Sequence, residues 1–373
     1  MRPELQRSLV RRVLAHLEAR TTDTEAAPSR RAASAYTDPA VFERERAMFR
    51  TGPIAVAHAT QLAEPGSFIT HDASGVPLLV VRGDDGELSA FLNVCRHRGT
   101  RLSDAPCGQA KAFVCPYHAW SYGRDGSLLG MPHERGFAGI SREERSLARV
   151  PVSVAAGLVF VNTDDAASYL GPLADDLASF GTATSHVYAP RVITRQLNWK
   201  LAIDVFLEAY HLRPTHQTSI YKMFFDNLGL VDPVGPHLRN VFPKRTIREL
   251  PSVPESDWVL RQHANVLFHI FPNTFILVEP DHAGVLHLWP LGIDRTLLTS
   301  YTLIPEPVAN DKARAYWDAN NAILESAIEE DFTMGESIQR GLASGANTDF
   351  VFGAFEHALA HFHREVDARV TQA

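Results

Sequence analysis

The spacing of apolar residues divides the chain into a helical start, a β-rich stretch and a mixed remainder. Apolar residues recur at helical intervals in residues 1–17 and again in residues 39–48, which predicts two helices. Between them, residues 20–35 are rich in Ala, Ser and Thr and show no apolar period. This segment is therefore predicted to be a linker or a mobile arm.

From about residue 52 the pattern changes to short apolar runs separated by Gly and Asp. Two Asp-Gly steps, Asp85-Gly86 and Asp125-Gly126, are typical of hairpin turns. The pattern predicts a small antiparallel β domain, with the loops around residues 95–118 at one tip. Its strands are predicted at residues 54–57, 77–81, 88–94, 112–114, 150–154 and 158–162.

Beyond residue 165 the pattern is mixed α+β, and four strand-like runs have hairpin spacing, which predicts one antiparallel sheet. We expect three regions: a helical arm and linker (residues 1–50) that packs on the last region, the β domain (51–165) and an α+β domain (166–373). The elements predicted in the last region are a helix at 199–212, an irregular segment at 215–254, strands at 265–270, 274–278, 285–289 and 296–303, and helices at 311–340 and 352–370.

Composition narrows the class of protein. The 373 residues, 45% of them hydrophobic, are enough for two or three globular domains. Lys and Arg number 36 against 43 Asp and Glu, and this net charge of −7 argues against nucleic acid or an anionic membrane as the main partner. Three cysteines cannot form a disulfide framework, and neither a signal peptide nor a membrane span is evident. A cytoplasmic protein is expected.

Two short motifs each pair a cysteine with a histidine. Cys95 and His97 form C-x-H, and Cys115 and His118 form C-x-x-H after an interval of seventeen residues. A Rieske [2Fe–2S] cluster needs these ligands, two Cys on one iron and two His on the other. Structural zinc is the alternative, but zinc motifs usually pair Cys with Cys and His with His. Cys107 has no matching His and is expected to be a small buried residue or a free thiol.

A second set of potential metal ligands lies in the last region. His211 and His216 flank Pro214, which disfavours helical geometry at the residue before it and so allows both imidazoles to meet one metal. Two His and one carboxylate are the usual protein ligands of an oxygen-activating mononuclear iron. Asp204 and Glu208 share one face of the predicted helix with His211, at i, i+4 and i+7, which indicates a site there.

The carboxylate ligand is predicted to be Asp331. This residue lies on a stripe of the long helix that should face the core, and burying a lone carboxylate is costly unless a cation compensates. Glu329 and Glu330 are the runner-up ligands, but they lie off the stripe. The stripe is formed by Leu324, Ala327, Ile328, Asp331, Met334 and Ile338.

These motifs together resemble one family. The run CPYHAWSYGRDGSLLGMP, from Cys115 to Pro132, resembles the second cluster loop and the following hairpin of the Rieske non-heme iron oxygenases, catalytic α-subunit type. The E-x-Y-H-x4-H motif from Glu208 to His216, followed late in the chain by Glu330-Asp331, resembles the family's facial triad. The resemblance extends over most of the chain. It implies an α+β fold in which a small antiparallel Rieske domain is inserted into a larger catalytic domain of the helix-grip type, with a central antiparallel sheet flanked by helices.

The resemblance also implies an activity. A terminal oxygenase of this type takes electrons from a separate NAD(P)H-dependent reductase, directly or through a ferredoxin. With O2 it hydroxylates or oxidatively demethylates a small organic substrate. No Gly-rich dinucleotide motif follows a strand here, in agreement with a separate reductase. An alternative of another class is a Rieske electron carrier without oxygenase activity, which would need the cluster but not the His211, His216 and Asp331 set.

The acid at position 208 has a further implication. In homotrimers of this family an acid at this position connects two subunits. The resemblance implies that Glu208 links His211 of its own subunit to the cluster ligand His118 of the partner subunit. Ring-dihydroxylating members mostly have Asp there, whereas Glu resembles the carnitine and betaine-type monooxygenases. Arene cis-dihydroxylation by a dioxygenase α subunit is therefore the alternative reaction.

The substrate pocket is expected to be apolar or aromatic. Such a wall suits an arene, and it also suits a quaternary ammonium through cation–π contacts. A carboxylated substrate would need an arginine, and Arg213, Arg239 and Arg245 are available. Five histidines are expected to be structural, with a place in the pocket lining as the alternative for one of them. They are His237, His263, His269, His282 and His287. The expected pocket residues are Phe206, Leu207, Phe224, Phe225, Leu228 and the strands at 266–270 and 275–278.

Overall fold

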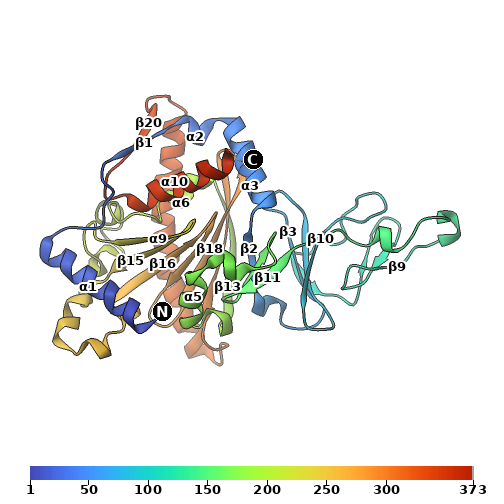
Figure 1. Ribbon diagram of the computed structural model, residues 1–373, viewed down its shortest axis with the longest axis horizontal. Coiled ribbons are helices and arrows are strands. Elements are labelled where there is room, and N and C mark those ends of the chain that lie inside the picture. Colours follow the sequence, from blue (N-terminus) through green and yellow to red (C-terminus); the bar gives the residue numbers. More distant parts are fainter. Residues whose placement is uncertain (372–373) are drawn as a thin grey trace. The chain divides into compact units, whose positions relative to one another are not determined.

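The computed structural model describes residues 1–371 and divides them into two compact units (Figure 1). One unit is formed by Phe49–Tyr169, and the other by residues 1–48 together with the chain from Leu170 onward. Among the described residues, no helix is both long and apolar enough to cross a lipid bilayer. The helices are α1 (Pro3–Ala19), α2 (Ser34–Thr37), α3 (Pro39–Thr51), α4 (Ala166–Leu170), α5 (Pro172–Ser179), α6 (Trp199–Asp204), α7 (Leu212–Thr215), α8 (Leu260–His263), α9 (Asp311–Leu342) and α10 (His357–Val370).

The smaller unit consists of three antiparallel sheets, with strand orders β10-β5-β4-β3-β6, β11-β12-β2 and β7-β8-β9. Apolar side chains from these strands enclose Cys95 and Cys115 in a buried core that also contains Trp120 and Tyr122. The strands are β2 (Ile54–His58), β3 (Ser67–His71), β4 (Leu78–Arg82), β5 (Leu88–Leu92), β6 (Cys107–Gln109), β7 (Phe113–Val114), β8 (Ser121–Tyr122), β9 (Leu128–Gly130), β10 (Arg149–Val150), β11 (Val152–Ala155) and β12 (Leu158–Val161).

Five of the six strands predicted for this unit are confirmed, as are both hairpin turns, where Gly86 and Gly126 adopt positive φ. The single strand predicted at 150–154 is wrong, because this run forms two strands, β10 and β11, in different sheets. Four strands were not predicted: β3, β6, β8 and β9. Three of these are only two or three residues long, and all three residues of β6 are exposed, so they carry no alternating pattern. Cys107 is an exposed free thiol in β6, so the free-thiol alternative is confirmed and the buried one is wrong.

The larger unit is built on a seven-stranded antiparallel sheet with strand order β13-β19-β18-β17-β16-β15-β14. All seven residues of β16 are buried, so this part of the sheet is covered on both faces. Helix α6 packs on β18, β19 and α9, while α10 packs on β14 and β15. The strands are β13 (His186–Arg195), β14 (Leu230–Val234), β15 (His237–Pro243), β16 (Ala264–Ile270), β17 (Thr274–Val278), β18 (Ala283–Gly292) and β19 (Arg295–Ile304).

The four predicted strands of this sheet and both C-terminal helices are confirmed. The prediction of an irregular segment at 215–254 is wrong, because this part of the chain contains the β14–β15 hairpin. Buried polar residues hide the alternation of apolar and polar positions in β15. Arg239 is one of them, and its ion pairs with Asp176 and Asp232 compensate its buried charge. Strand β13 was also missed, since it lies at the sheet edge and alternates poorly.

The prediction of a single helix at 199–212 is also wrong. Helix α6 ends at Asp204, and α7 begins only at Leu212. Between them, the Glu208 carboxylate accepts hydrogen bonds from the backbone N–H groups of Tyr210 and His211, the second at 3.0 Å. A side chain that caps these amides replaces the carbonyl partners that a continuous helix would supply. Asp204, Glu208 and His211 therefore do not share a helical face.

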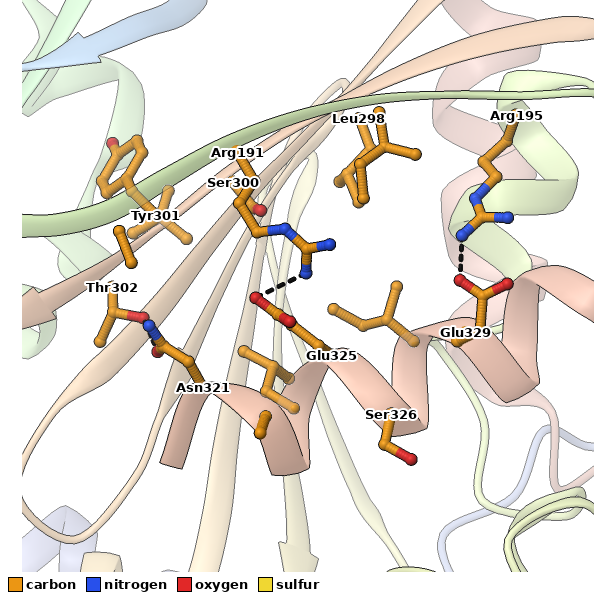
Figure 2. A pocket seen from close by; sticks show the side chains of 16 residues that line it. Arg191, Arg195, Leu298, Ser300, Tyr301, Thr302, Asn321, Glu325, Ser326 and Glu329 are labelled. Atoms are coloured by element: carbon orange, nitrogen blue, oxygen red, sulfur yellow. Dashed lines mark hydrogen bonds and ion pairs between the residues drawn. The ribbon is translucent and has the colours of Figure 1, made fainter. Parts of the chain in front are cut away.

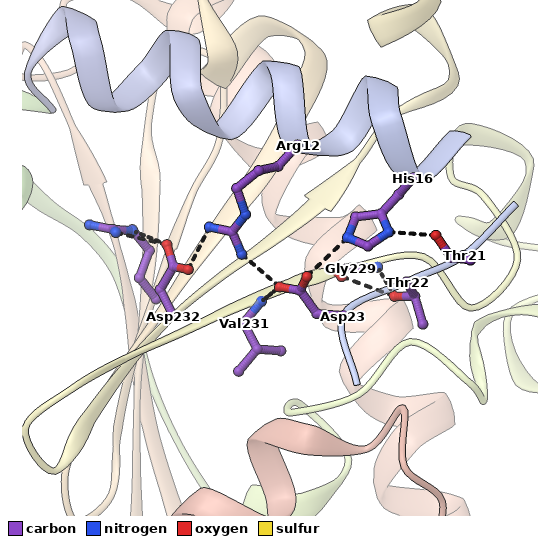
Figure 3. A network of polar contacts seen from close by, with 9 residues as sticks. Arg12, His16, Thr21, Thr22, Asp23, Gly229, Val231 and Asp232 are labelled. Atoms are coloured by element: carbon purple, nitrogen blue, oxygen red, sulfur yellow. Dashed lines mark hydrogen bonds and ion pairs between the residues drawn. The ribbon is translucent and has the colours of Figure 1, made fainter. Parts of the chain in front are cut away.

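The segment predicted to be a linker or mobile arm is fixed to the larger unit. Its strand β1 (Ser29–Ala32) pairs antiparallel with β20 (Asp349–Phe352). Figure 3 shows the polar network that holds the segment before it, in which the Arg12 guanidinium bridges Asp23 and Asp232 at 2.7 and 2.6 Å. His16 lies 2.9 Å from Asp23. The prediction failed because polar residues and not an apolar stripe attach this segment.

A fully buried ion pair joins α3 to α6. Lys200 Nζ and Glu45 Oε1 are paired with no exposed side-chain surface, and Glu45 Oε2 accepts a hydrogen bond from Trp199 Nε1 at 2.8 Å. Burial lowers the pKa of Lys200, and the charge of Glu45 opposes that shift. Either charge alone would be left without compensation inside the protein.

We expect Glu45→Ala to lower the free energy of unfolding by about 3–5 kcal/mol, because it leaves a buried ammonium unpaired. The double variant Glu45→Met/Lys200→Met should lose less than the single variant, since neither charge remains. Glu43→Ala is the control, because Glu43 pairs with Arg46 on the exposed side of the same helix and should cost at most about 1 kcal/mol. Denaturant midpoints check the ranking, and a double variant less stable than Glu45→Ala would contradict it.

Candidate functional site

The two Cys/His motifs of the smaller unit adopt the same loop conformation. The N–H of each cysteine donates to the carbonyl five residues on at 2.8 Å, and Gly99 and Ala119 donate back to Cys95 and Cys115 at 3.0 Å. Both of these fourth residues have positive φ, 86° for Gly99 and 58° for Ala119. Glycine adopts this conformation freely, whereas Ala119 is held in it at some cost in energy. The sequence thus builds one turn twice, each presenting a Cys and a His.

The imidazoles of the two loops point at one another. His97 Nδ1 lies 3.1 Å from His118 Nδ1, and the His97 ring stacks on Trp120 with 4.8 Å between centroids. Both rings are half-buried. Equivalent nitrogens that face one another in this way suit two ligands of a single iron, as a Rieske cluster requires.

The two thiols lie deeper than the imidazoles. Cys95 and Cys115 are each 2% exposed, and Tyr122 Oη lies 3.4 Å from Cys95 Sγ while accepting the N–H of Arg96 at 2.9 Å. Burial raises the pKa of the Cys95 thiol, although Tyr122 opposes the shift. A buried pair of thiolates needs a metal to compensate its charge, so this donor set fits the iron–sulfur cluster.

In the larger unit the structure brings His211, His216 and Asp331 together. One ligand atom from each lies within 4.8 Å of the other two. Asp331 Oδ1 is 2.9 Å from His216 Nε2 and 3.3 Å from His211 Nε2. It is nevertheless buried without a well-directed hydrogen bond from any of residues 1–371. Three ligand atoms that converge without satisfying one another fit a metal ion, and two His with one carboxylate suit Fe(II).

Each histidine of this set is anchored through its other nitrogen. Nδ1 of His211 is bonded to Glu208, and Nδ1 of His216 lies 2.5 Å from Glu330, which also accepts a hydrogen bond from Ser219 at 2.7 Å. Both Nε2 atoms are thereby directed toward Asp331. Such carboxylate–histidine pairs fix the tautomer and the ring orientation of a metal ligand.

The field at this site favours a positive charge. Burial alone would lower the pKa of His211, but Asp331 and Glu208 outweigh it and raise that pKa to about 10. His216 responds in the same direction, since Asp331 and Glu330 outweigh its burial and raise its pKa. Three carboxylates around two imidazoles therefore form a site suited to a cation.

Other residues considered for this site lie elsewhere. Asp204 accepts a hydrogen bond from Tyr36 at 2.8 Å and lies 2.9 Å from His363, outside the ligand cluster. Glu329 is exposed and paired with Arg195 of β13, away from the ligand cluster. The predicted apolar stripe is wrong at its C-terminal end, where Met334 and Ile338 are exposed.

A small pocket of about 100 Å³ adjoins the three potential ligands. Of the residues expected to form a substrate pocket, Phe206 and Phe224 line it, as do Leu267 and Leu277 of the two strands. Leu207, Phe225 and Leu228 do not line it. Sequence reasoning missed Phe242 and Asn265, which face each other across the β15–β16 ladder, a pairing that no local pattern reveals. The lining is Val205, Phe206, Glu208, His211, Leu212, His216, Ile220, Phe224, Phe242, Asn265, Leu267, Leu277, Leu324, Ala327, Ile328 and Asp331.

None of the arginines considered for a carboxylated substrate lines this pocket. Arg239 is paired with two acids inside the unit, and Arg213 is paired with Asp226 at 3.1 Å. Arg245 stacks over the rings of Tyr221 and Phe225. Among the described lining residues there is neither Arg nor Lys.

A second cavity of about 330 Å³ lies between α9 and the β13–β19 edge of the sheet (Figure 2). Arg191 and Glu325 form an ion pair at 2.5 Å beside it, and Arg195 and Glu329 form another. Leu324 and Ile328 line both this cavity and the smaller pocket. Aliphatic side chains of α9 are therefore common to the walls of both.

Family comparisons agree with both donor sets. Residues 176–372 match the ring hydroxylating alpha subunit (catalytic domain), and residues 52–150 match the Rieske [2Fe-2S] domain. The chain belongs to the Rieske non-heme iron oxygenases. It is a catalytic subunit that uses a Rieske [2Fe–2S] cluster, a mononuclear non-heme iron and O2. The alternatives of structural zinc and of a pure electron carrier are therefore wrong.

Several relatives of this oxygenase have named activities. The carnitine monooxygenase oxygenase subunit of Acinetobacter pittii is 30% identical over 356 residues, 89% of this chain and 92% of its own. The chlorobenzene dioxygenase subunit alpha of a Cupriavidus strain is 35% identical over 215 residues, 54% of this chain and 47% of its own. The quaternary ammonium monooxygenase CntA has been solved with its substrates L-carnitine and γ-butyrobetaine; the TM-scores are 0.76 and 0.74, at 26% and 25% identity. Each of these two superpositions covers 91% of this chain and 94% of the CntA chain.

We expect Asp331→Ala to remove the mononuclear iron of the oxygenase and to leave its cluster intact. Iron content should fall from about three to about two per chain, because a three-ligand site loses its only carboxylate while nothing near Cys95 changes. Iron analysis and the visible spectrum of anaerobically prepared protein measure the two sites separately. Glu329→Ala is the control and should keep the full content, whereas full iron in Asp331→Ala would contradict the prediction.

Proposed function

We propose that this chain is the terminal component of a two-component oxygenase and hydroxylates or oxidatively demethylates a small organic substrate. Its electrons would come from a separate NAD(P)H-dependent flavin or iron–sulfur reductase, directly or through a ferredoxin. One observation carries the proposal: the His211, His216 and Asp331 set opens onto a pocket whose other walls are almost entirely apolar. When bound, the cluster supplies electrons and the iron supplies oxygen chemistry.

Individual residues have distinct roles in this proposal. Cys95, Cys115, His97 and His118 hold the cluster, and the ligand set around Asp331 holds the iron. Glu208 and Glu330 keep the two imidazoles oriented. The phenylalanines of the pocket hold the substrate beside the iron and exclude water, which limits side reactions there.

Oxidative demethylation of a quaternary ammonium is the favoured reaction. The carnitine monooxygenase relative covers most of this chain, whereas the arene relative covers about half. Three phenylalanine rings, Phe206, Phe224 and Phe242, line the pocket together with the acids Glu208 and Asp331. Aromatic faces and nearby carboxylates both attract a bulky cation that carries no hydrogen-bond donor on its nitrogen.

Arene dihydroxylation is the second candidate, and a specific observation favours it. The described lining of the pocket contains no Arg or Lys to pair with the carboxylate of a carnitine-like molecule. Phenylalanine and leucine walls accommodate a neutral aromatic ring equally well. The two reactions leave different products, since hydroxylation of an N-methyl carbon releases formaldehyde and dihydroxylation of an arene yields a diol.

Oxygen uptake with a surrogate reductase tests these proposals. The panel contains glycine betaine, L-carnitine, γ-butyrobetaine, chlorobenzene and naphthalene, and each trace is paired with product analysis. Substrate-dependent uptake with formaldehyde release supports demethylation, and a cis-diol supports the arene alternative. If no organic molecule, in this panel or a wider one, stimulates oxygen uptake by the iron-loaded protein, the oxygenase proposal is contradicted.

We also propose that Glu208 acts between subunits of a homotrimer. In this arrangement it would link His211 to the cluster ligand His118 of the partner subunit. Glu208 is only 11% exposed at its side chain, and it is already bonded to His211 Nδ1 and to two backbone amides. Its carboxylate is therefore held in a defined position, as a connecting group must be.

We expect Glu208→Gln to retain both metal centres and to lose turnover by more than a factor of about 10–100, the usual cost of removing a partner of a metal-bound His. The loss should be larger because the connection between the centres is removed as well. Single-turnover experiments on prereduced protein, with O2 and a substrate identified in the panel, measure reoxidation of the cluster. Glu329→Gln, an acid outside the ligand cluster, is the control. Reoxidation of Glu208→Gln at the wild-type rate would show that Glu208 is not the connection.

A further inference from the structure

Asn265 interrupts the apolar wall of the iron pocket. Apart from Glu208 and the three potential iron ligands, it is the one polar side chain among the described lining residues. It lies near the start of β16 and is 9% exposed. A polar group in a wall of phenylalanine and leucine costs desolvation energy unless something bonds to it.

The orientation of the Asn265 amide is fixed from outside the pocket. Its Nδ2 donates to Glu279 Oε1 at 2.8 Å, and Glu279 Oε2 lies 3.2 Å from the ammonium of Lys244. An ionised carboxylate can only accept hydrogen bonds, so the amide nitrogen must be the end that faces Glu279. Asn265 can therefore offer only its oxygen to a molecule in the pocket.

That oxygen has no hydrogen-bond partner in the part of the chain that the structure describes. Asn265 Oδ1 is buried and receives no hydrogen bond from any of residues 1–371. Leaving a buried acceptor without a partner is destabilising, and native proteins contain few such groups. A wall residue that is fixed at one end and unsatisfied at the other has the properties of a ligand contact.

A second asparagine lies beside it on the same face of the sheet. In the β15–β16 ladder, Phe242 is opposite Asn265 and Asn240 is opposite Leu267. Residues two apart on a strand share a face, so Asn240 is on the side that carries Phe242. It is fully buried, and neither atom of its amide has a hydrogen-bond partner within residues 1–371. Asn240 is therefore a second unsatisfied amide on this face of the sheet, near Asn265 but outside the pocket lining.

We propose that Asn265, with Asn240 beside it, forms a polar subsite that accepts a hydrogen bond from a hydroxyl or N–H group of the substrate. This inference rests on the proposed function, because it takes the pocket as the substrate site. The substrate class is an apolar or cationic body that carries one hydrogen-bond donor away from the reacting carbon. Molecules of the same shape without that donor leave Oδ1 unsatisfied, so they bind more weakly.

Two probe pairs isolate the donor. L-carnitine differs from γ-butyrobetaine by one hydroxyl group, and indole differs from indene by an N–H in place of a CH2. Calorimetric titration of anaerobic, iron-loaded protein measures binding without turnover. We expect the donor-bearing member of at least one pair to bind about tenfold more tightly, which corresponds to about 1.4 kcal/mol. Asn265→Leu should reduce that ratio to within twofold and leave the donor-free member unaffected.

Two further variants keep the test decisive. Leu267→Met changes a neighbouring lining residue without a polar group and should preserve the ratio. Asn265→Ala replaces Asn265→Leu if the latter loses iron or cluster absorption. Equal binding within both pairs, a ratio that survives both Asn265 variants, or no binding of any of the four probes overturns the inference. The proposed function fails on different evidence, namely missing mononuclear iron or no substrate-dependent oxygen uptake.

Stability of the ligand-free protein gives an independent reading. If the amide of Asn240 has no partner before substrate binds, Asn240→Leu should raise the unfolding midpoint or leave it unchanged. Asn198→Leu is the matched control, because that buried amide donates to Tyr36 and Ile293 and accepts from Lys200. It should lower the midpoint. A loss in Asn240→Leu equal to that in Asn198→Leu would overturn the assignment of Asn240 to the subsite.

Discussion

The larger unit depends on one buried carboxylate. Asp331 lies inside the protein with two imidazole nitrogens near its Oδ1 and no well-directed hydrogen bond to that atom from the described chain. Burial of such a group is unfavourable unless a cation shares the site. The surrounding structure follows from this demand: α9 supplies the carboxylate, while His211 and His216 flank the short helix α7 that follows the break after α6. Glu208 and Glu330 then fix the imidazoles from behind.

The smaller unit meets the same constraint with different ligands. There the buried anions are thiolates, and the loops that carry them repeat one backbone turn, with Gly99 and Ala119 in equivalent conformations. A strained alanine at one of these positions indicates that loop geometry, and with it the direction of the cysteine and histidine side chains, takes precedence over local backbone preference. Both centres are thus preformed by the protein around positions that metal ions would occupy.

In the proposed substrate pocket, selectivity follows from how little polarity the walls contain. Its walls are aromatic and aliphatic, so binding there discriminates weakly by shape alone, as one methylene group changes affinity only modestly. A single fixed acceptor in such a wall discriminates more strongly, because a ligand that fails to meet it leaves a buried group unsatisfied. The orientation of Asn265 comes from Glu279 and Lys244, which lie outside the pocket. Substrate preference can therefore change through residues that never touch the substrate.

The sequence alone determined the features that short stretches encode. The C-x-H and C-x-x-H motifs, the His211 and His216 pair, the main strands and helix α9 are local patterns, and Asp331 was identifiable because a charged residue on an apolar stripe requires a partner. The features that depend on contacts between distant residues were decided only by the tertiary structure. It ended α6 at Asp204, attached the N-terminal segment through Arg12, and made β14 and β15 strands despite their polar residues. It also turned Glu330 into the anchor of His216 and placed Asn265 in the pocket wall. These outcomes depend on which distant residues meet, and spacing along one strand or helix carries no record of that.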